Sequence, residues 1–149
     1  MVSKKEYILF DKDTQSFIYN MQTNAVQRML DFDYVAGRKT SSVAAIVNPT
    51  GNDSFQKFFF GPKEILVPVY KSLKNAANRH KNVDVMINFA SFRSAATSTE
   101  EAFTIPQIRT VVIIAEGVPE RRMRELIAKA KQLKKVIIGP ATVGGIVPG

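Results

Sequence analysis

Arg109-Thr-Val-Val-Ile-Ile-Ala115 and, after an amphipathic segment, Val136-Ile-Ile138 form the stretch that decides the fold. The first run is almost wholly apolar and rich in β-branched residues, which is typical of a strand buried on both faces. Pro119, between the two runs, suits the first turn of a helix. Two buried strands joined by a helix predict a parallel pair. The apolar stripe of the joining helix is Met123, Leu126, Ile127, Ala130 and Leu133.

The rest of the chain repeats this alternation of strand and helix. Ser98-Thr-Glu-Glu101 fits a capping box at the start of one helix, and Pro62 and Pro68 bracket another short apolar run. Such alternation predicts an α/β fold, Rossmann-like and doubly wound around a mainly parallel sheet. Strands are predicted at residues 6–10, 16–19, 42–47, 55–60 and 83–89, and helices around 26–34, 69–77 and 98–106.

Composition narrows the class of protein further. A length of 149 residues predicts one domain, spanning residues 1–149. The absence of cysteine excludes disulfides and thiolate metal sites, and His80, the single histidine, is predicted to lie solvated at a helix end. We therefore expect no metal site and no catalytic residue. No membrane-spanning run and no signal peptide are evident, so we expect a cytoplasmic protein.

The charge is strongly basic, with 21 Lys and Arg against 13 Asp and Glu. A net charge of +8 favours polyanionic partners such as nucleic acid, nucleotides or phosphate-rich cofactors. Much of the excess lies between residues 121 and 135, where the alternative is an ordinary solvated helix face. No aromatic residues alternate with these charges, so a base-stacking surface is disfavoured.

Ligands of doubly wound sheets bind outside the carboxyl ends of the strands, and two loops there carry suitable side chains. In Ala90-Ser-Phe-Arg-Ser94, two hydroxyls and a guanidinium cluster at a strand end, and Arg93 could bind a phosphate there with two parallel hydrogen bonds. Alternatively, Arg93 is a surface residue and Ser94 caps a helix. Glu116 precedes Gly117 after the most apolar strand, where it could accept hydrogen bonds from a ribose or an amide, or could be a structural or capping carboxylate.

Two further loops at this edge, the turn after residues 16–19 and the loop at the end of the chain, differ in their glycine content. The turn after residues 16–19 lacks Gly-x-Gly-x-x-Gly, which argues against ordinary NAD binding, although a helix N-terminus there still favours phosphate. Thr23 or Asn24 could instead be a plain helix cap. The final loop contains Gly139, Gly144 and Gly145, which would let a backbone approach a ligand closely. Its abrupt end leads us to expect a piece of a longer chain.

Several strings together resemble ATP-citrate lyase, in the region related to the α subunit of succinyl-CoA synthetase. The resemblance runs from about residue 11 to residue 149. The segment Ile138-Gly-Pro-Ala-Thr-Val-Gly-Gly145 is its most specific part. The other strings are Met21-Gln-Thr-Asn-Ala-Val-Gln27, Met29-Leu-Asp-Phe-Asp-Tyr-Val35, Lys63-Glu-Ile-Leu-Val-Pro-Val69, Asp84-Val-Met-Ile-Asn-Phe-Ala-Ser91 and Ala115-Glu-Gly-Val-Pro119.

The resemblance implies a coenzyme A (CoA) site in four loops. The first turn would meet the CoA phosphates, and the second loop would border the adenine side. The third loop matches a family segment that contacts CoA, and the fourth matches one near the pantetheine arm. Family members usually have glycine where this chain has Asn20. The implied residues are Met21, Gln22, Thr23, Pro49, Thr50, Phe89, Ser91, Arg93, Ser94, Ala115, Glu116 and Gly117.

The resemblance also implies a parent enzyme that converts citrate, CoA and ATP to acetyl-CoA and oxaloacetate through citryl-phosphate and citryl-CoA. ATP and Mg²⁺ would bind elsewhere, in an ATP-grasp subunit, and a citrate-synthase-like module would cleave citryl-CoA. This domain alone would be inactive. The alternatives are the matching chain of a succinyl-CoA or citryl-CoA synthetase, a non-catalytic CoA or nucleotide sensor and, more remotely, a nucleic-acid-binding protein.

Overall fold

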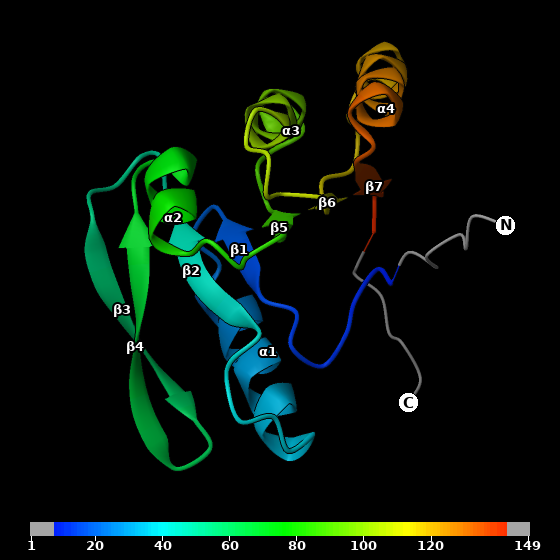
Figure 1. The fold of residues 1–149 in the computed structure, drawn as a ribbon. Coiled ribbons are helices and arrows are strands. Elements are labelled where there is room, and N and C mark those ends of the chain that lie inside the picture. The colour runs from blue at the N-terminus through cyan, green and yellow to red at the C-terminus, as the bar shows by residue number, and fades with distance from the viewer. Residues whose placement is uncertain (1–7, 143–149) are drawn as a thin grey trace, which may run out of the picture.

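The computed structural model describes residues 8–142 and contains seven strands and four helices in that range (Figure 1). The chain alternates between the two, apart from one β-hairpin. In order, the elements are β1 Ser16–Tyr19, α1 Thr23–Val35, β2 Val43–Val47, β3 Ser54–Phe60, β4 Lys63–Tyr70, α2 Leu73–Arg79, β5 Val85–Asn88, α3 Ala95–Phe103, β6 Thr110–Ile113, α4 Glu120–Leu133 and β7 Val136–Ile138.

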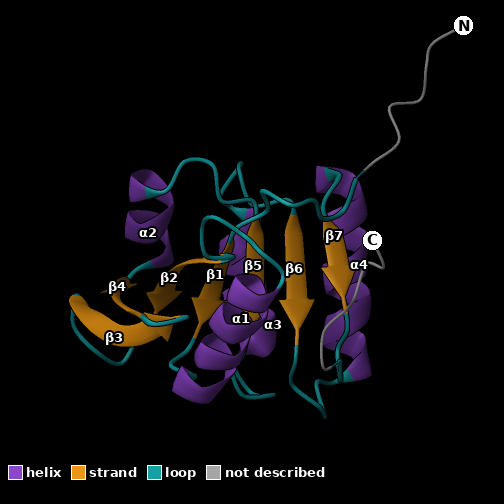
Figure 2. Cartoon of the chain, turned by 90° about the horizontal axis from the view of Figure 1, so that it is seen from below, coloured by secondary structure: helices purple, strands orange, loops and turns teal. Residues whose placement is uncertain are grey.

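All seven strands join one sheet in the order β3-β4-β2-β1-β5-β6-β7. Every neighbouring pair is parallel except β3 and β4, which form an antiparallel hairpin at one edge (Figure 2). The chain builds outward from β1 in one direction and then returns to continue from β5 in the other. The topological switch point therefore lies between β1 and β5. The predicted Rossmann-like, mainly parallel α/β fold is confirmed.

Helices cover both faces of the sheet, with α1 on one side and α2, α3 and α4 on the other (Figure 1). Successive residues of β1 contribute to opposite cores, since Ile18 belongs to the core cluster that contains Val26 and Leu30 of α1, whereas Phe17 belongs to the cluster that contains Leu126 of α4. All five of these side chains are buried. Apolar residues on both sides of each central strand explain why the strands are nearly continuous hydrophobic runs.

Two of the predicted strands and helices are wrong in part. Ile8 to Phe10 are not in a strand, and the remainder of the strand predicted at 6–10 lies outside the described residues. Val69 belongs to β4 and not to a helix. Pro68 does not end the strand because it faces Phe55 in the ladder with β3, and the ladder with β2 begins only at Val69. The missing N–H of Pro68 is therefore tolerated.

The predicted capping box at Ser98 is also wrong. Helix α3 begins at Ala95, and Ser98 and Thr99 lie inside it with buried side chains. In α4, Met123, Leu126 and Ala130 are buried as predicted, whereas Ile127 and Leu133 are more than two-fifths exposed. The helix therefore contacts the sheet along a narrower stripe than its sequence suggests. Within residues 8–142, no helix is long and apolar enough to cross a bilayer.

A side chain of α1 covers part of the free edge of the sheet. The Gln27 amide nitrogen donates to the carbonyl oxygen of Phe59 at 2.8 Å, and its oxygen accepts from the Phe59 N–H at 3.0 Å. The Gln27 amide thus makes the two bonds that a further strand would make at this position. It also fixes α1 to the hairpin.

Candidate functional site

Backbone hydrogen bonds hold the carboxyl ends of the central strands in register. The Asn20 N–H donates to the Val47 carbonyl at 2.7 Å, and the Phe89 N–H donates to the Tyr19 carbonyl at 3.0 Å. On the other side of β5, the Ile114 N–H donates to the Asn88 carbonyl at 3.1 Å. The loops after β1, β2, β5 and β6 therefore leave the sheet along one edge, where the parallel topology predicts a ligand.

The first loop turns sharply at Asn20. Its φ of 79° lies in the left-handed region, which asparagine tolerates better than most residues other than glycine. The side chain stabilises the turn from within, since its oxygen accepts from the Met21 N–H at 3.1 Å and its nitrogen donates to the Phe89 carbonyl at 3.4 Å. Asparagine here thus adopts the backbone conformation that glycine adopts most readily.

Helix α1 begins directly after this turn. Gln22 occupies the N-cap position and its side chain makes no capping hydrogen bond. Neither Thr23 nor Asn24 is the cap, so the capping alternative is wrong for both. Gln22 and Thr23 are exposed, and Met21 is half-buried. The N–H groups of the first helical turn, which lack intrahelical acceptors, lie beside these three side chains and favour an anion.

The second loop, after β2, is a tight turn. The Gly51 N–H donates to the Asn48 carbonyl at 3.1 Å, and the Thr50 hydroxyl donates to the Asn48 side-chain oxygen at the same distance. Pro49 and Thr50 are exposed at its tip. Hydrogen bonds within the turn fix its shape. No helix follows the turn directly, because the next element is β3.

The third loop, after β5, is the richest in polar side chains. Ser91, Arg93 and Ser94 are exposed, and the two serine hydroxyls lie 3.2 Å apart. The Arg93 guanidinium lies 5.3 Å from the centroid of the Phe92 ring, a cation–π contact that leaves its edge available to an anion. Ser94 occupies the N-cap position of α3, but its side chain makes no capping bond. Phe89 is half-buried at the start of the loop.

Asn88, the last residue of β5, is a polar residue of this region that the sequence did not single out. Its side chain is fully buried and hydrogen-bonded at both ends, to residues on either side of the third loop. Its sequence signal is a lone amide at the end of an otherwise apolar strand.

The fourth loop, after β6, contains a left-handed glycine. Gly117 has a φ of 74°, with open space where a Cβ would be. Glu116 is exposed, and no hydrogen bond or ion pair joins it to another described residue. It does not cap α4, which begins at Glu120 after Pro119. Ala115 accepts a 2.9 Å hydrogen bond from the Ala141 N–H, which places the loop after β7 beside this one.

The glycine loop at the end of the chain is described only in part. Gly139 has a φ of 104°, and a Cβ there would overlap the carbonyl oxygen of Ile113. Glycine is therefore required for packing against β6 at this position. Gly144 and Gly145, the other glycines predicted to approach a ligand, lie outside the described residues.

Tyr19, at the end of β1, faces away from α1 and toward α3. Its hydroxyl donates to the Glu101 carboxylate at 3.4 Å. Burial, with the nearby negative charge of Glu101, raises the pKa of Tyr19 to about 12. The phenol therefore stays neutral near pH 7 and links β1 to α3 beneath the loops.

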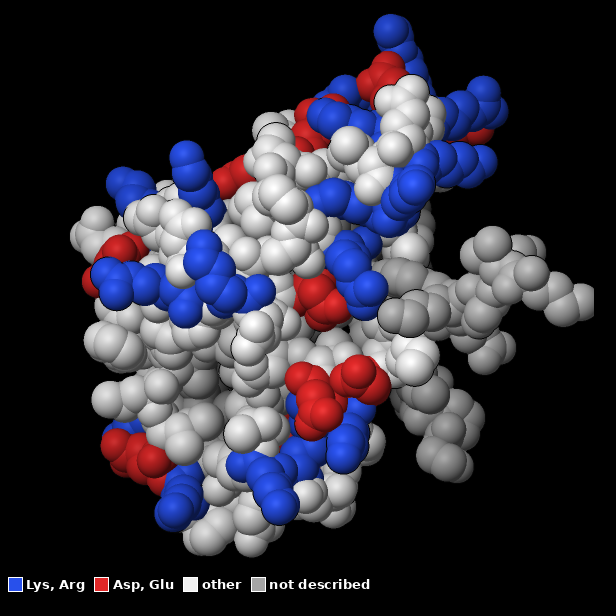
Figure 3. Space-filling view, in the orientation of Figure 1, with Lys and Arg blue, Asp and Glu red and all other residues white. Residues whose placement is uncertain are grey.

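The basic residues of α4 form a solvated face, as the simpler alternative predicted. Ion pairs join Arg121 to Glu125 at 3.2 Å and Arg122 to both Glu125 and Glu100 at 2.7 and 3.2 Å. Figure 3 shows acidic side chains interspersed among the basic ones at the top of the view, where α4 lies. The positive charge of this helix is partly neutralised locally, so net charge alone does not locate a polyanion site.

His80 lies at the C-cap of α2, as predicted, but it is not simply solvated. Its Nε2 lies 3.1 Å from the Tyr70 hydroxyl, and its ring packs edge-on against Phe17. Burial lowers the pKa of His80. In the described part of the chain, no three His, Asp or Glu side chains converge as metal ligands would.

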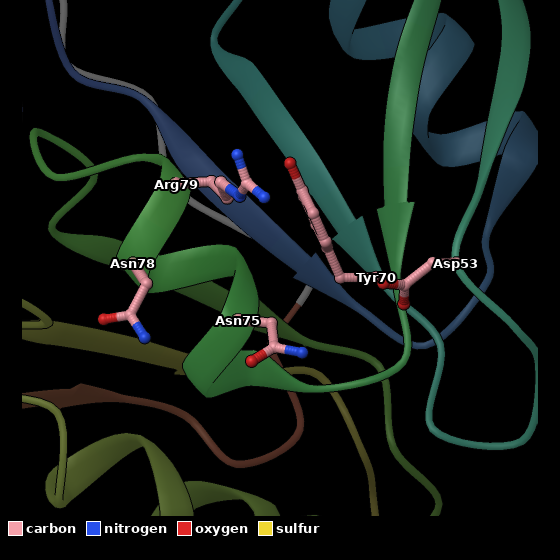
Figure 4. A pocket seen from close by; sticks show the side chains of 5 residues that line it. All are labelled: Asp53, Tyr70, Asn75, Asn78 and Arg79. Carbon is pink, nitrogen blue, oxygen red and sulfur yellow. The ribbon is translucent and has the colours of Figure 1, made fainter.

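A polar pocket of about 290 Å³ lies between α2 and the end of β4 (Figure 4). Arg79 and Tyr70 project toward one another across it, whereas Asn78 points away. None of the twelve predicted CoA residues lines this pocket. The loop edge is the candidate site because ligands of doubly wound sheets bind outside the carboxyl ends of the parallel strands. Its lining residues are Asp53, Tyr70, Asn75, Asn78 and Arg79.

The family model for the CoA binding domain matches residues 11–117, which include all four loops. This chain belongs to the CoA-binding domain family. The match covers β1 to β6 and ends at Gly117, in the fourth loop. The family is thus defined over the part of the sheet that carries the candidate site.

Longer proteins contain close relatives of this CoA-binding domain. The chain is 57% identical over 148 residues to the probable ATP-citrate synthase subunit 1 of Schizosaccharomyces pombe, covering 99% of this chain and 24% of the relative. It is 56% identical over 145 residues to the human ATP-citrate synthase, covering 97% of this chain and 13% of the relative. The chain thus spans about a quarter or less of the length of these relatives.

Solved structures show the same fold. The ATP citrate lyase of Methanosaeta concilii, in complex with (3S)-citryl-CoA, superposes with a TM-score of 0.91 and 52% identity, over 93% of this chain and 22% of that one. The Methanothrix soehngenii enzyme, in complex with citrate and coenzyme A, gives the same values. The superposition covers nearly the whole of this chain at 52% identity.

Proposed function

We propose that this CoA-binding domain belongs to an ATP-citrate lyase and binds CoA at the carboxyl edge of its sheet. One observation carries the proposal: enzymes solved with citryl-CoA and with coenzyme A contain a domain 52% identical to this chain at a TM-score of 0.91. The parent enzyme would make acetyl-CoA and oxaloacetate from citrate, CoA and ATP, through citryl-phosphate and citryl-CoA.

Several of the twelve predicted residues supply donors suited to CoA. The first helical turn at Thr23 offers backbone N–H groups to a phosphate. Arg93 offers a guanidinium and Ser91 a hydroxyl, both exposed on the third loop. CoA carries about four negative charges at neutral pH when its monoester and diphosphate are counted. A cationic side chain and free N–H groups along one edge match that charge pattern.

This domain would position the CoA thiol and supply no catalytic side chain. ATP and Mg²⁺ would bind to an ATP-grasp subunit of the parent enzyme, and a citrate-synthase-like module would cleave citryl-CoA. The parent would be a cytoplasmic hetero-oligomer. These partners follow from the resemblance to ATP-citrate lyase, and the likeness to longer ATP-citrate synthases supports them.

Calorimetric titration of CoA into the purified chain tests the proposal. We expect saturable binding that weakens about tenfold or more in Arg93→Ala, because a charge-assisted contact to phosphate is lost. Arg28→Ala is a matched control, since Arg28 is also an exposed arginine but lies on α1 outside the four loops. Equal affinities for wild type and Arg93→Ala would show that the site assignment is wrong.

A further inference from the structure

Asn88 makes more side-chain hydrogen bonds than any of the twelve predicted CoA residues. Its Nδ2 lies 2.8 Å from the Ser98 hydroxyl, 3.1 Å from the Thr99 hydroxyl and 3.1 Å from the Ala95 carbonyl oxygen. Its Oδ1 accepts from the Ala90 N–H at 3.0 Å. The side chain is wholly buried, so water does not compete for these bonds.

These bonds join the two ends of the third loop. Ala90 is at the beginning of the loop, and Ala95 opens α3 directly after it. Additional bonds tighten the same turn, since the Ser98 hydroxyl donates to the Ser94 carbonyl at 2.9 Å and the Ala95 N–H donates to the Ser91 carbonyl at 2.8 Å. The intervening residues are thus fixed at both ends by one buried side chain.

Only an amide satisfies both ends at once. An aspartate at this position would keep the acceptor for Ala90 but would lose both donor hydrogens toward α3. A leucine would leave the Ala90 N–H without its partner and the α3 hydroxyls without a donor. The buried amide therefore determines the path of the backbone between β5 and α3 and does not merely fill space.

We infer that Asn88 is a positioning residue for CoA: it holds Ser91, Arg93 and Ser94 in the conformation that binds CoA without touching the ligand itself. This inference rests on the proposed function. It predicts that loss of the Asn88 amide weakens CoA binding even when the sheet and helices remain folded, because the loop must then be ordered on binding.

The test compares Asn88→Ala with Leu126→Ala. Leu126 is also almost fully buried, but it lies on α4 and takes no part in the hydrogen bonds that join the ends of the third loop. CoA titration is done at a temperature where circular dichroism shows all variants folded. Amide hydrogen exchange of residues 89–94 is measured in parallel. Thr99→Val, which removes one acceptor of the Asn88 amide, takes the place of Asn88→Ala if that variant does not fold.

We expect Asn88→Ala to weaken CoA binding about tenfold or more and to speed amide exchange in residues 89–94. Leu126→Ala should remain within about twofold of wild type in affinity and leave exchange in the loop unchanged. Thr99→Val should give a smaller loss of affinity, about threefold, and faster exchange in the same segment.

Wild-type affinity in Asn88→Ala, or an equal loss in Leu126→Ala, would overturn the inference. If the wild type itself binds no CoA, the proposed function fails instead. The exchange data then decide the positioning role alone: faster exchange confined to residues 89–94 supports it, and unchanged exchange refutes it.

Discussion

The side-chain nitrogen of Asn20 donates a 3.4 Å hydrogen bond to the carbonyl oxygen of Phe89. This bond crosses the switch point between β1 and β5 and ties the first candidate loop to the third. Both loops contain predicted CoA residues, so the bond fixes the distance between two parts of the proposed site. The side chain of Asn20 thus provides a contact that a glycine at this position would lack.

Two replacements of Asn20 separate the contribution of its hydrogen bond to Phe89 from the contribution of its left-handed backbone conformation. Asn20→Ala loses the bond to Phe89. It also places alanine, which adopts the left-handed region less readily than asparagine, at a φ of 79°. We expect a loss of about 2 kcal/mol in the free energy of unfolding. Asn20→Gly loses the bond but tolerates the backbone, so its loss should be within about 1 kcal/mol. Urea denaturation of both variants measures the difference, and equal losses would contradict this account.

Gly139 should tolerate no side chain. In Gly139→Ala, the added Cβ overlaps the Ile113 carbonyl oxygen, and the φ of 104° is unfavourable for alanine. We expect a loss of about 2–4 kcal/mol in the free energy of unfolding. Gly117→Ala is the control, since its φ of 74° is also left-handed but the Cβ meets open space. Its loss should be about 1 kcal/mol; thermal unfolding that ranks the two variants the other way round would refute the steric argument.

The Gln27 amide should protect the edge of the sheet. Gln27→Ala exposes the N–H and carbonyl of Phe59, whose ring is already half exposed. Unpaired backbone groups on an apolar edge strand promote pairing with another chain. We expect concentration-dependent self-association, visible in sedimentation velocity, together with a stability loss of about 1–2 kcal/mol. Arg28→Ala on the same helix should stay monodisperse to the same degree as wild type.

His80 should make stability depend on pH. Its pKa is lowered in the folded protein by burial, from an ordinary value of 6.5. The unfolded chain therefore binds the proton more readily, and the contribution of neutral His80 to stability is lost as pH falls below about 6.5. We expect the unfolding midpoint to drop between pH 7.5 and pH 5.5, and to drop less in His80→Gln. An identical pH dependence in the variant would rule out His80 as the cause.

The sheet was largely predictable because its central strands carry apolar side chains toward both helical layers. The run containing Val111 and Ile113 is buried, as its continuous apolar and β-branched composition predicts for a central strand of a parallel sheet. The local prediction at Pro68 is wrong because a strand tolerates proline only where the ladder does not need its N–H. Which neighbouring strand Pro68 faces is a tertiary property. Local sequence does not contain that information.

The candidate site was predictable only in outline. Parallel topology places the four loops at one edge, and this follows from the order of strands and helices. The bonds that shape the loops join residues whose contacts depend on the fold, such as Asn88 with Ser98 and Thr99. The pattern around Ser98 predicts a helix cap because serine commonly caps when a glutamate follows three residues later, whereas in the structure its hydroxyl accepts from the buried amide of Asn88.

The measurement that tests the central proposal most directly is a CoA titration followed by backbone amide NMR. We expect saturable shifts at Thr23, Thr50, Arg93 and Gly117, one from each loop at the carboxyl edge, and none in the β3–β4 hairpin. Shifts that instead centre on the pocket at Asp53 and Arg79, or no saturable shift at all, would contradict a CoA site at this edge.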